Sequence, residues 1–288
     1  MKPWKPLQGV TMPHELGRQR IHAFADGERG GNPAYVIAST EPAAARQSEL
    51  IAIARAQGCE VTHLHFTGEP GTARARFYVP TGEIAFCGHG ALAAAAWAMR
   101  AGQAQDRLLL VHQGGEILMQ RHNDGQTGFT DTAGNTREHP MTRPLLRELR
   151  AMLGLPDLQG EDVALHLGGK QRRKALIALS SPRWLARISL DAERRDRFCR
   201  HHELTGIYPF AVSAHGDILS RHFPLAAGLD EDMATGNIAP TVAALVCGDR
   251  PWPLNILQGG PNCDTARLLL QPTEDGLWFV GGYCRHVA

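Results

Sequence analysis

The sequence predicts an α+β fold of two pseudo-symmetric lobes, each a curled, antiparallel-rich β-sheet around one central helix. Two stretches of the same build, 77–99 and 222–245, lie about half a chain apart. Each passes from an aromatic residue and a proline through an acidic turn to a bend of small residues and an alanine-rich apolar run. Such similarity predicts two lobes of one design. The many short alternating segments and only two strongly apolar helices favour curled sheets over a doubly wound sheet.

Composition describes an ordinary globular protein. The 288 residues are 43% hydrophobic and 20% charged, and the formal net charge is +1, so no general field attracts nucleic acid or an anionic membrane. We interpret the basic runs 171–174 and 194–200 as solvated surface. The six cysteines lack metal-type spacing, no apolar run approaches the roughly 20 residues of a membrane span, and residues 1–20 lack a signal-type apolar core. We expect free thiols and a cytoplasmic protein with neither nucleic-acid nor membrane partners.

The first half is expected to hold a weakly ordered leader, 1–18, and an N-terminal lobe, 19–124. Helical spacing predicts a helix over 41–56, and the alanine run 91–99 predicts a buried helix. Residues 113–115 are expected to turn a hairpin. Alternation predicts strands at 20–24, 34–37, 62–66, 73–79, 108–112 and 116–120.

The C-terminal lobe is expected over 125–276, with a crossover near 125–136, and the last strand, 277–288, is a candidate to complete the N-terminal lobe. Helices are predicted at 143–153, which Gly154 ends, and at 190–201, which is expected to be exposed. A second buried helix is predicted to start near Asn237, and residues 243–247 close it. Strands are predicted at 164–167, 174–179, 208–213, 217–223, 267–271 and 277–283.

The two bends predict a binding site for a small carboxylate. Glycine at each bend lets the backbone approach a ligand, and the N–H groups at the start of the following helix attract an anion. Neither bend carries Lys or Arg, so the helix starts near Gly90 and Asn237 are expected to bind the substrate carboxylate largely through backbone groups. The expected substrate-binding residues at these bends are Cys87, Gly88, Gly90, Thr235, Gly236 and Asn237.

Glu60 and His89 are candidates for proton transfer. Glu60 lies between a helix end and a strand, where a partly buried carboxyl has a raised pKa suited to an acid/base; the alternative is a surface glutamate at a turn. His89 follows Gly88 at a helix start, where the helix dipole favours a neutral ring that can exchange hydrogen bonds. Its alternative is an N-cap histidine satisfied by the backbone.

Cys87 and Asp232 stand at matching places in the two bends. A thiol at a helix N-terminus has a lowered pKa and can act as a base or nucleophile, but a small buried cysteine is also common in cores. Asp232 either caps a helix or orients a catalytic proton.

Other site types lack support in the sequence. His63 and His65 share a strand face without further ligands at a metal-type spacing, which favours surface or cross-strand packing. The glycines of 27–31 do not form GxGxxG, so a dinucleotide site is not expected. The chain has no GxSxG elbow.

The ordered motifs resemble the PhzF-like isomerase family of phenazine biosynthesis, which has the diaminopimelate epimerase-like fold. The motifs are Gly31-Asn32-Pro33, then Glu60, then FxxPxxE followed by CGH ending at His89, then DxATGN from Asp232 to Asn237. Together they span nearly the whole chain after the leader. Asn237 stands where the family often has serine.

The resemblance implies that Glu60 transfers the proton, that His89 and Asp232 assist, and that Asn32 belongs to the substrate site. It further implies a homodimer that needs neither cofactor nor metal and acts on a small carboxylated substrate, of which a dihydro-hydroxyanthranilate is one example. Relatives that racemise use two cysteines, whereas here the second position is Asp232. A two-base racemase or epimerase and a non-catalytic carboxylate-binding protein are the alternatives.

Overall fold

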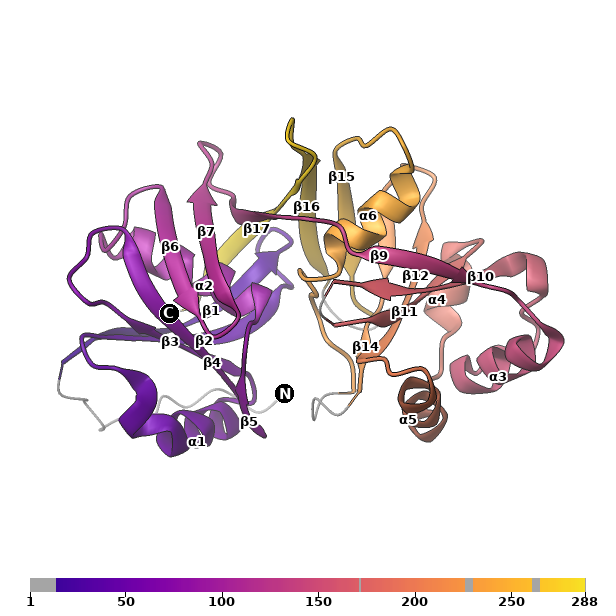
Figure 1. The fold of residues 1–288 in the computed structure, drawn as a ribbon, viewed down its shortest axis with the longest axis horizontal. Coiled ribbons are helices and arrows are strands. Elements are labelled where there is room, and N and C mark those ends of the chain that lie inside the picture. The colour runs from indigo at the N-terminus through magenta and orange to yellow at the C-terminus, as the bar shows by residue number, and fades with distance from the viewer. Residues whose placement is uncertain (1–13, 171, 226–229, 261–264, 288) are drawn as a thin grey trace.

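The computed structural model describes residues 14–170, 172–225, 230–260 and 265–287. Two sheet-rich halves lie side by side, joined by the segment between β8 and β9 and by the last strands of the chain (Figure 1). The first half contains β1 Glu15–Ala25, β2 Asn32–Ser39, η1 Ala43–Arg46, α1 Gln47–Gln57, β3 Glu60–His65, β4 Thr72–Val79, β5 Gly82–Ile84, α2 Gly88–Arg100, β6 Arg107–His112, β7 Gly115–Arg121 and β8 Thr127–Asp131.

The second half carries more helices. It contains β9 Asn135–His139, α3 Arg143–Leu153, η2 Gly160–Asp162, β10 Val163–Gly169, β11 Lys174–Leu179, α4 Pro182–Arg187, α5 Ala192–His201, β12 Gly206–Val212, β13 Ile218–Ser220, β14 Phe223–Pro224, α6 Ala239–Cys247, β15 Leu254–Gln258, β16 Ala266–Pro272 and β17 Trp278–His286.

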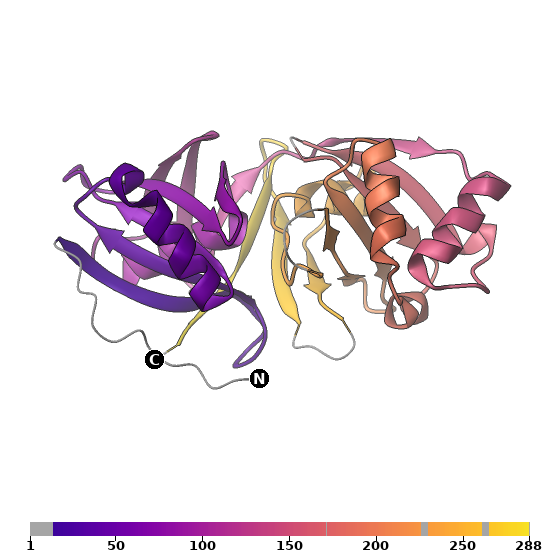
Figure 2. The same ribbon diagram turned by 90° about the horizontal axis from the view of Figure 1, so that it is seen from below.

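Helix α2 is the centre of the first half. It contacts β1, β2, β3, β6, β7, β8 and β17, and every residue from Gly90 to Met99 is buried. Alanine makes this possible, because its small side chain lets a sheet curl closely around the helix. Helix α1 lies outside that sheet, across β2, β3 and β4 (Figure 2). The sequence prediction of a buried alanine helix is confirmed.

The second half places helices on both faces of its sheet. Helix α6 contacts β9, β16 and β17 on the inner side and shares one hydrophobic core with α2. Helices α3, α4 and α5 enclose a separate core against β10, β11 and β12. The mixed, sheet-rich α+β class predicted from the sequence is therefore correct.

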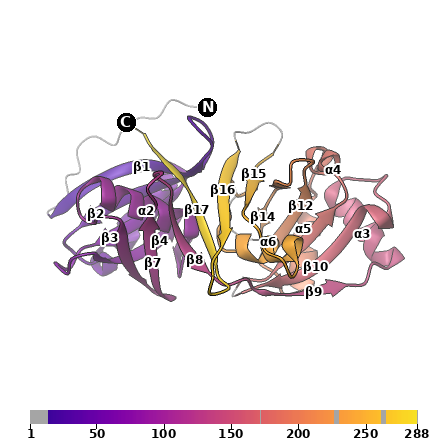
Figure 3. The ribbon, with the colours of Figure 1, turned by 90° about the horizontal axis from the view of Figure 1, so that it is seen from above.

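Strand β17 connects the two halves. It pairs antiparallel with β1, with β8 and with β16, and it runs between the halves beside β16 (Figure 3). The last strand thus completes the sheet of the first half and is also continuous with the second. A division into lobes between residues 124 and 125 stays a prediction.

Several local predictions were wrong. Strand β1 begins at Glu15, so residues 15–18 belong to the sheet; residues 1–13 of the expected leader lie outside the described part. The predicted exposed helix, α5, buries Arg195, Phe198 and Cys199, so the interpretation of 194–200 as solvated surface is wrong for these residues. Strands β5, β8, β9 and β15 and helix α4 were not predicted. They are short, β8 lies inside the expected crossover 125–136, and β15 follows Pro251 and Pro253, which resemble a loop. Within the described residues, no helix is long and apolar enough to cross a membrane.

Candidate active site

The two bends meet and enclose a small cavity. A Cβ atom on Gly88 would lie 3.7 Å from the Cα of Gly236, so the start of α2 faces the loop before α6. The cavity has a volume of about 100 Å³. It is lined by Glu60, Ile84, Phe86, Cys87, Gly88, His89, Arg172, Lys174, His222, Pro224, Asp232, Ala234, Thr235, Gly236 and Asn237. Most of the residues predicted from the sequence therefore surround one space.

Glu60 is buried, and the surface alternative is wrong. It is the first residue of β3, two residues after the left-handed Gly58 that ends α1, and only 6% of it is exposed. Its carboxylate accepts a hydrogen bond of 3.4 Å from the Thr62 hydroxyl. Burial raises the pKa of Glu60, although the nearby His89 and a hydrogen bond with Cys87 oppose this. A carboxyl so placed is suited to both accepting and donating a proton.

Gly90 makes room for that carboxylate. A Cβ atom on Gly90 would lie 2.0 Å from Oε1 of Glu60 and 2.5 Å from Oγ1 of Thr62. Gly90 does not line the cavity. It packs against the Glu60 carboxylate, and the expectation that it contacts the substrate is not met.

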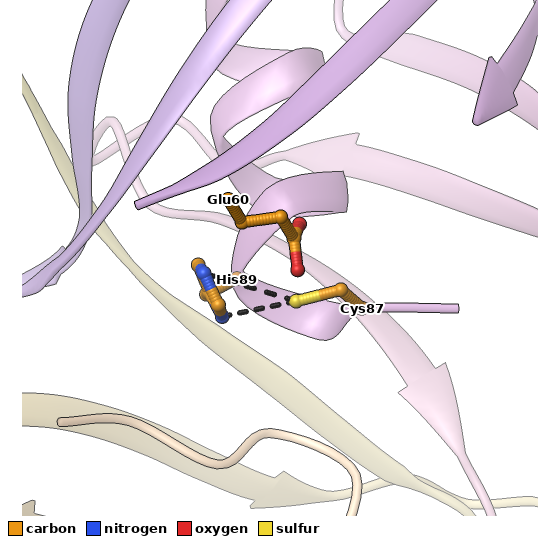
Figure 4. A group of neighbouring side chains, drawn as sticks. All are labelled: Glu60, Cys87 and His89. Atoms are coloured by element: carbon orange, nitrogen blue, oxygen red, sulfur yellow. Dashed lines mark hydrogen bonds between the residues drawn. The ribbon is translucent and has the colours of Figure 1, made fainter. Parts of the chain in front are cut away.

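Cys87 and His89 lie beside Glu60. Figure 4 shows the Glu60 carboxyl and the His89 ring turned toward the Cys87 sulfur, and Sγ lies 3.0 Å from Nδ1 of His89. Burial, followed by the negative charge of Glu60, raises the pKa of Cys87 well above its usual value. The expectation of a lowered pKa at a helix N-terminus is wrong, because burial beside a carboxylate outweighs the helix dipole.

Asp232 anchors a hydrogen-bond network between distant segments. Its Oδ1 accepts from Nδ2 of Asn32 at 2.7 Å, and its Oδ2 accepts from the Thr235 hydroxyl at 2.8 Å and from Nδ1 of His222 at 3.1 Å. Burial alone would raise the pKa of Asp232, but these donors and the neighbouring imidazoles hold it below its usual range. Asp232 is therefore an ionised acceptor, and Nδ1 of His222 carries the proton.

The capping alternative for Asp232 is wrong. Helix α6 begins at Ala239, and its N-cap, Ile238, makes no side-chain capping bond. Of the neighbouring acidic residues, Glu231 forms an ion pair of 2.7 Å with Arg221. The bend at 235–237 is accordingly a turn before α6 and not the first turn of that helix.

Asn32 supports the site from behind the cavity. Its Nδ2 donates to Asp232 and, at 3.2 Å, to the carbonyl of Ala234. These two bonds use both amide hydrogens of Asn32. Its nitrogen also lies 3.3 Å from Nδ1 of His89 but has no hydrogen left to donate, so this ring nitrogen can pair with Cys87.

Backbone N–H groups of both bends border the cavity. For Gly88, His89, Gly236 and Asn237, the described residues supply no acceptor to the backbone N–H. This arrangement is suited to an anion, as the sequence predicts.

Sequence reasoning missed two cations of the cavity. Arg172 and Lys174 line it, and Lys174 is only 1% exposed, so the interpretation of 171–174 as solvated surface is wrong for Lys174. A run of basic residues does not reveal that the chain enters β11 at Lys174 and turns its side chain inward. The available signal was the apolar run that follows Lys174 in β11, since a strand buried on both faces also buries its first residue.

His222 and Gln258 were also missed. Nε2 of Gln258 donates to the carbonyl of Asp232 at 2.6 Å, and burial lowers the pKa of His222 to about 4. His222 stands at the head of the second repeated stretch, which was a usable signal.

Metal binding has one candidate group among the described residues. Each of Glu60, Cys87 and His89 offers one ligand atom, and these atoms lie within 4.8 Å of one another. Carboxylate, thiolate and imidazole are all zinc ligands. His63 on β3 instead packs in the core and pairs with the Ser39 hydroxyl at 3.0 Å. A site without metal or cofactor stays a prediction.

A second, larger cavity of about 660 Å³ adjoins the first. Both cavities are lined by Ile84, Phe86, Arg172 and Asn237. The larger one extends past His112 and Glu116 to Asp131 and Lys170.

The family model of phenazine biosynthesis-like proteins matches residues 21–250. The chain belongs to this family. It is 28% identical over 232 residues, 77% of each chain, to trans-2,3-dihydro-3-hydroxyanthranilate isomerase of Pseudomonas chlororaphis. It is 25% identical over 233 residues, 75% of this chain and 74% of the relative, to an uncharacterized isomerase of Escherichia coli. Its curated relatives are thus named isomerases, and the protein is an enzyme of that class.

Solved structures share the fold. A PhzF-family protein of Bacillus anthracis superposes with a TM-score of 0.79 at 19% identity, over 94% of this chain and 96% of that one. A hydroxyproline epimerase of Agrobacterium vitis superposes with a TM-score of 0.54 at 11% identity, over 96% of this chain and 92% of that one. The architecture is therefore that of PhzF and proline racemase-like proteins.

Proposed function

We propose that this protein is a cofactor-independent isomerase that moves a proton on a small carboxylated substrate, with Glu60 as the general acid/base. The observation that carries the proposal is the position of Glu60, a buried carboxyl with a raised pKa in the wall of the cavity between the two bends. A carboxyl whose pKa burial has raised is suited to both taking up and releasing a proton.

The proposed reaction assigns one task to each group. The backbone N–H groups of Gly88 and Gly236 hold the substrate carboxylate. The Glu60 carboxylate takes a proton from one carbon and returns it to another, so the substrate changes only in the positions of a hydrogen and a double bond. His89, beside Glu60 and Cys87, hydrogen-bonds to the substrate, and ionised Asp232 fixes the opposite wall.

A two-base racemase that uses cysteine is less well supported. Such an enzyme needs a thiolate, and burial beside Glu60 keeps the Cys87 thiol protonated. The matching position in the other bend is Asp232, which is fully engaged by Asn32, His222 and Thr235.

Solvent-deuterium exchange tests the proposal. The panel contains trans-2,3-dihydro-3-hydroxyanthranilate, L-proline, trans-4-hydroxy-L-proline and diaminopimelate, each incubated with enzyme in D₂O and read by mass spectrometry. We expect label in at least one acid, and its loss in Glu60→Gln. Binding of an acid without exchange would support the non-catalytic alternative. The homodimer implied by the family is tested separately by light scattering, where a mass of 31.4 kDa would contradict it.

A further inference from the structure

Lys174 is a buried cation with little compensation. It begins β11 and lines the smaller cavity, yet 1% of it is exposed. Its Nζ donates one hydrogen bond, of 3.3 Å, to the neutral Thr205 hydroxyl. Among the described residues, no carboxylate lies within ion-pair distance of Nζ. An ammonium group out of water requires an anionic partner or a strong set of acceptors, and Lys174 has neither.

The groups around Lys174 do not supply that partner. Burial, followed by the charge of Arg172, lowers the pKa of Lys174 to about 8, while Asp232 and Cys199 oppose this. The amine nevertheless carries its charge at neutral pH. Asp232 already accepts hydrogen bonds from four donors, which include the backbone N–H of Ala234 at 3.5 Å. His222 is neutral because burial and Lys174 itself lower its pKa to about 4.

Structure alone does not require a lysine here. The other residues of β11 are apolar, and a methionine of similar length would fill the space of Lys174 without burying a charge. Arg172 extends the positive lining from this cavity into the larger one. Two cations and the unpaired N–H groups therefore border a space whose ionised Asp232 is already satisfied.

We propose that Lys174 binds a second anionic group of the substrate, distinct from the carboxylate at the two bends, so that the enzyme acts on a dianion such as a dicarboxylate. This inference rests on the proposed function, because both groups occupy the same cavity. The competing possibility is that Lys174 shares the first carboxylate, in which case a monocarboxylate suffices.

Calorimetric titration of the full chain separates these possibilities. The probes are succinate against butyrate and glutarate against valerate, pairs of equal carbon number that differ by one carboxylate. We expect the dicarboxylate to bind at least about 30-fold more tightly, the loss typical of truncating one partner of a buried charge pair. Lys174→Met is expected to abolish that preference while monocarboxylate binding remains.

Lys170→Met is the matched control. Lys170 is half exposed and already paired with Asp131 at 2.5 Å, so the same substitution is expected to preserve the preference. Equal affinity for both members of each pair in the unmodified protein, or an equal loss for both in Lys174→Met, would overturn the inference.

A second measurement tests Lys174 without comparing the affinities of dicarboxylates and monocarboxylates. The lysines of the chain are Lys2, Lys5, Lys170 and Lys174, so a ¹³Cε-lysine spectrum is simple, and Lys174→Met assigns the Lys174 signal. Glutarate is expected to raise the pH at which this signal titrates, and an unchanged titration overturns the inference. Failure of the proposed function would give a different result from failure of this inference. Glu60→Gln would then retain deuterium exchange, whatever Lys174 binds.

Discussion

Gly90→Ala is expected to disable the enzyme without removing any catalytic group. The new methyl group would lie 2.0 Å from Oε1 of Glu60 and 2.5 Å from Oγ1 of Thr62, whereas ordinary contacts measure 3.4–4 Å. Gly90 is inside α2 and is not among the glycines with a positive φ, so its backbone tolerates alanine. The carboxylate is the flexible partner and must move by more than 1 Å.

The size of the effect follows from that displacement. A misplacement of about 1 Å costs on the order of 100-fold in rate, because the acid/base no longer meets the reacting carbon. Stability behaves differently. Alanine gains up to about 1 kcal/mol over glycine inside a helix, which offsets the cost of moving the Glu60 carboxylate and the Thr62 hydroxyl. We expect the free energy of unfolding to change by no more than about 1 kcal/mol.

The assay compares initial rates of deuterium incorporation into the acid identified by the exchange screen, alongside urea unfolding. Gly160→Ala is the matched control, since the nearest atom to a Cβ there is Cδ2 of Leu146 at 4.0 Å, and it should exchange normally. If Gly90→Ala is folded and exchanges at the unmodified rate, the Glu60 carboxylate does not act from this position.

Three further substitutions test the site. Glu60→Gln should slow exchange by about 10²–10⁴-fold. Because the folded state raises the pKa of Glu60, the unmodified protein loses stability as the pH rises above 4.5. The variant should therefore become increasingly more stable than the unmodified protein over that range, as urea unfolding across pH 4–8 would show. Cys87→Ser should retain most of the exchange since the thiol is protonated, and its loss there, with retention in Glu60→Gln, would assign the base to sulfur. Asp232→Asn should lower the free energy of unfolding by about 1.5–3 kcal/mol at pH 7. The difference from the unmodified protein should shrink as the pH falls through the lowered pKa of Asp232. A difference that does not change with pH would contradict an ionised Asp232.

The sequence alone determined the features that arise from local pattern. The alanine run predicted α2 as a buried helix, and helical period with Gly154 at the end predicted α3 over its full length. The order of the motifs also named Glu60, His89 and Asp232 and indicated the family, because each motif is a short contiguous stretch whose chemistry depends on its own residue types.

The tertiary structure alone decided the electrostatics of the site. Asn32 and Asp232 are 200 residues apart in the chain, and nothing near either residue predicts their hydrogen bond. The same holds for the raised pKa of Cys87 and for the inward position of Lys174. The pKa of an ionisable group depends on every segment that excludes water from it, and those segments come together only when the two halves of the fold pack against each other. The local pattern at Cys87 suggested a reactive thiolate, and that at Lys174 a solvated surface. Both readings failed because burial, a property of the whole fold, dominates at each position.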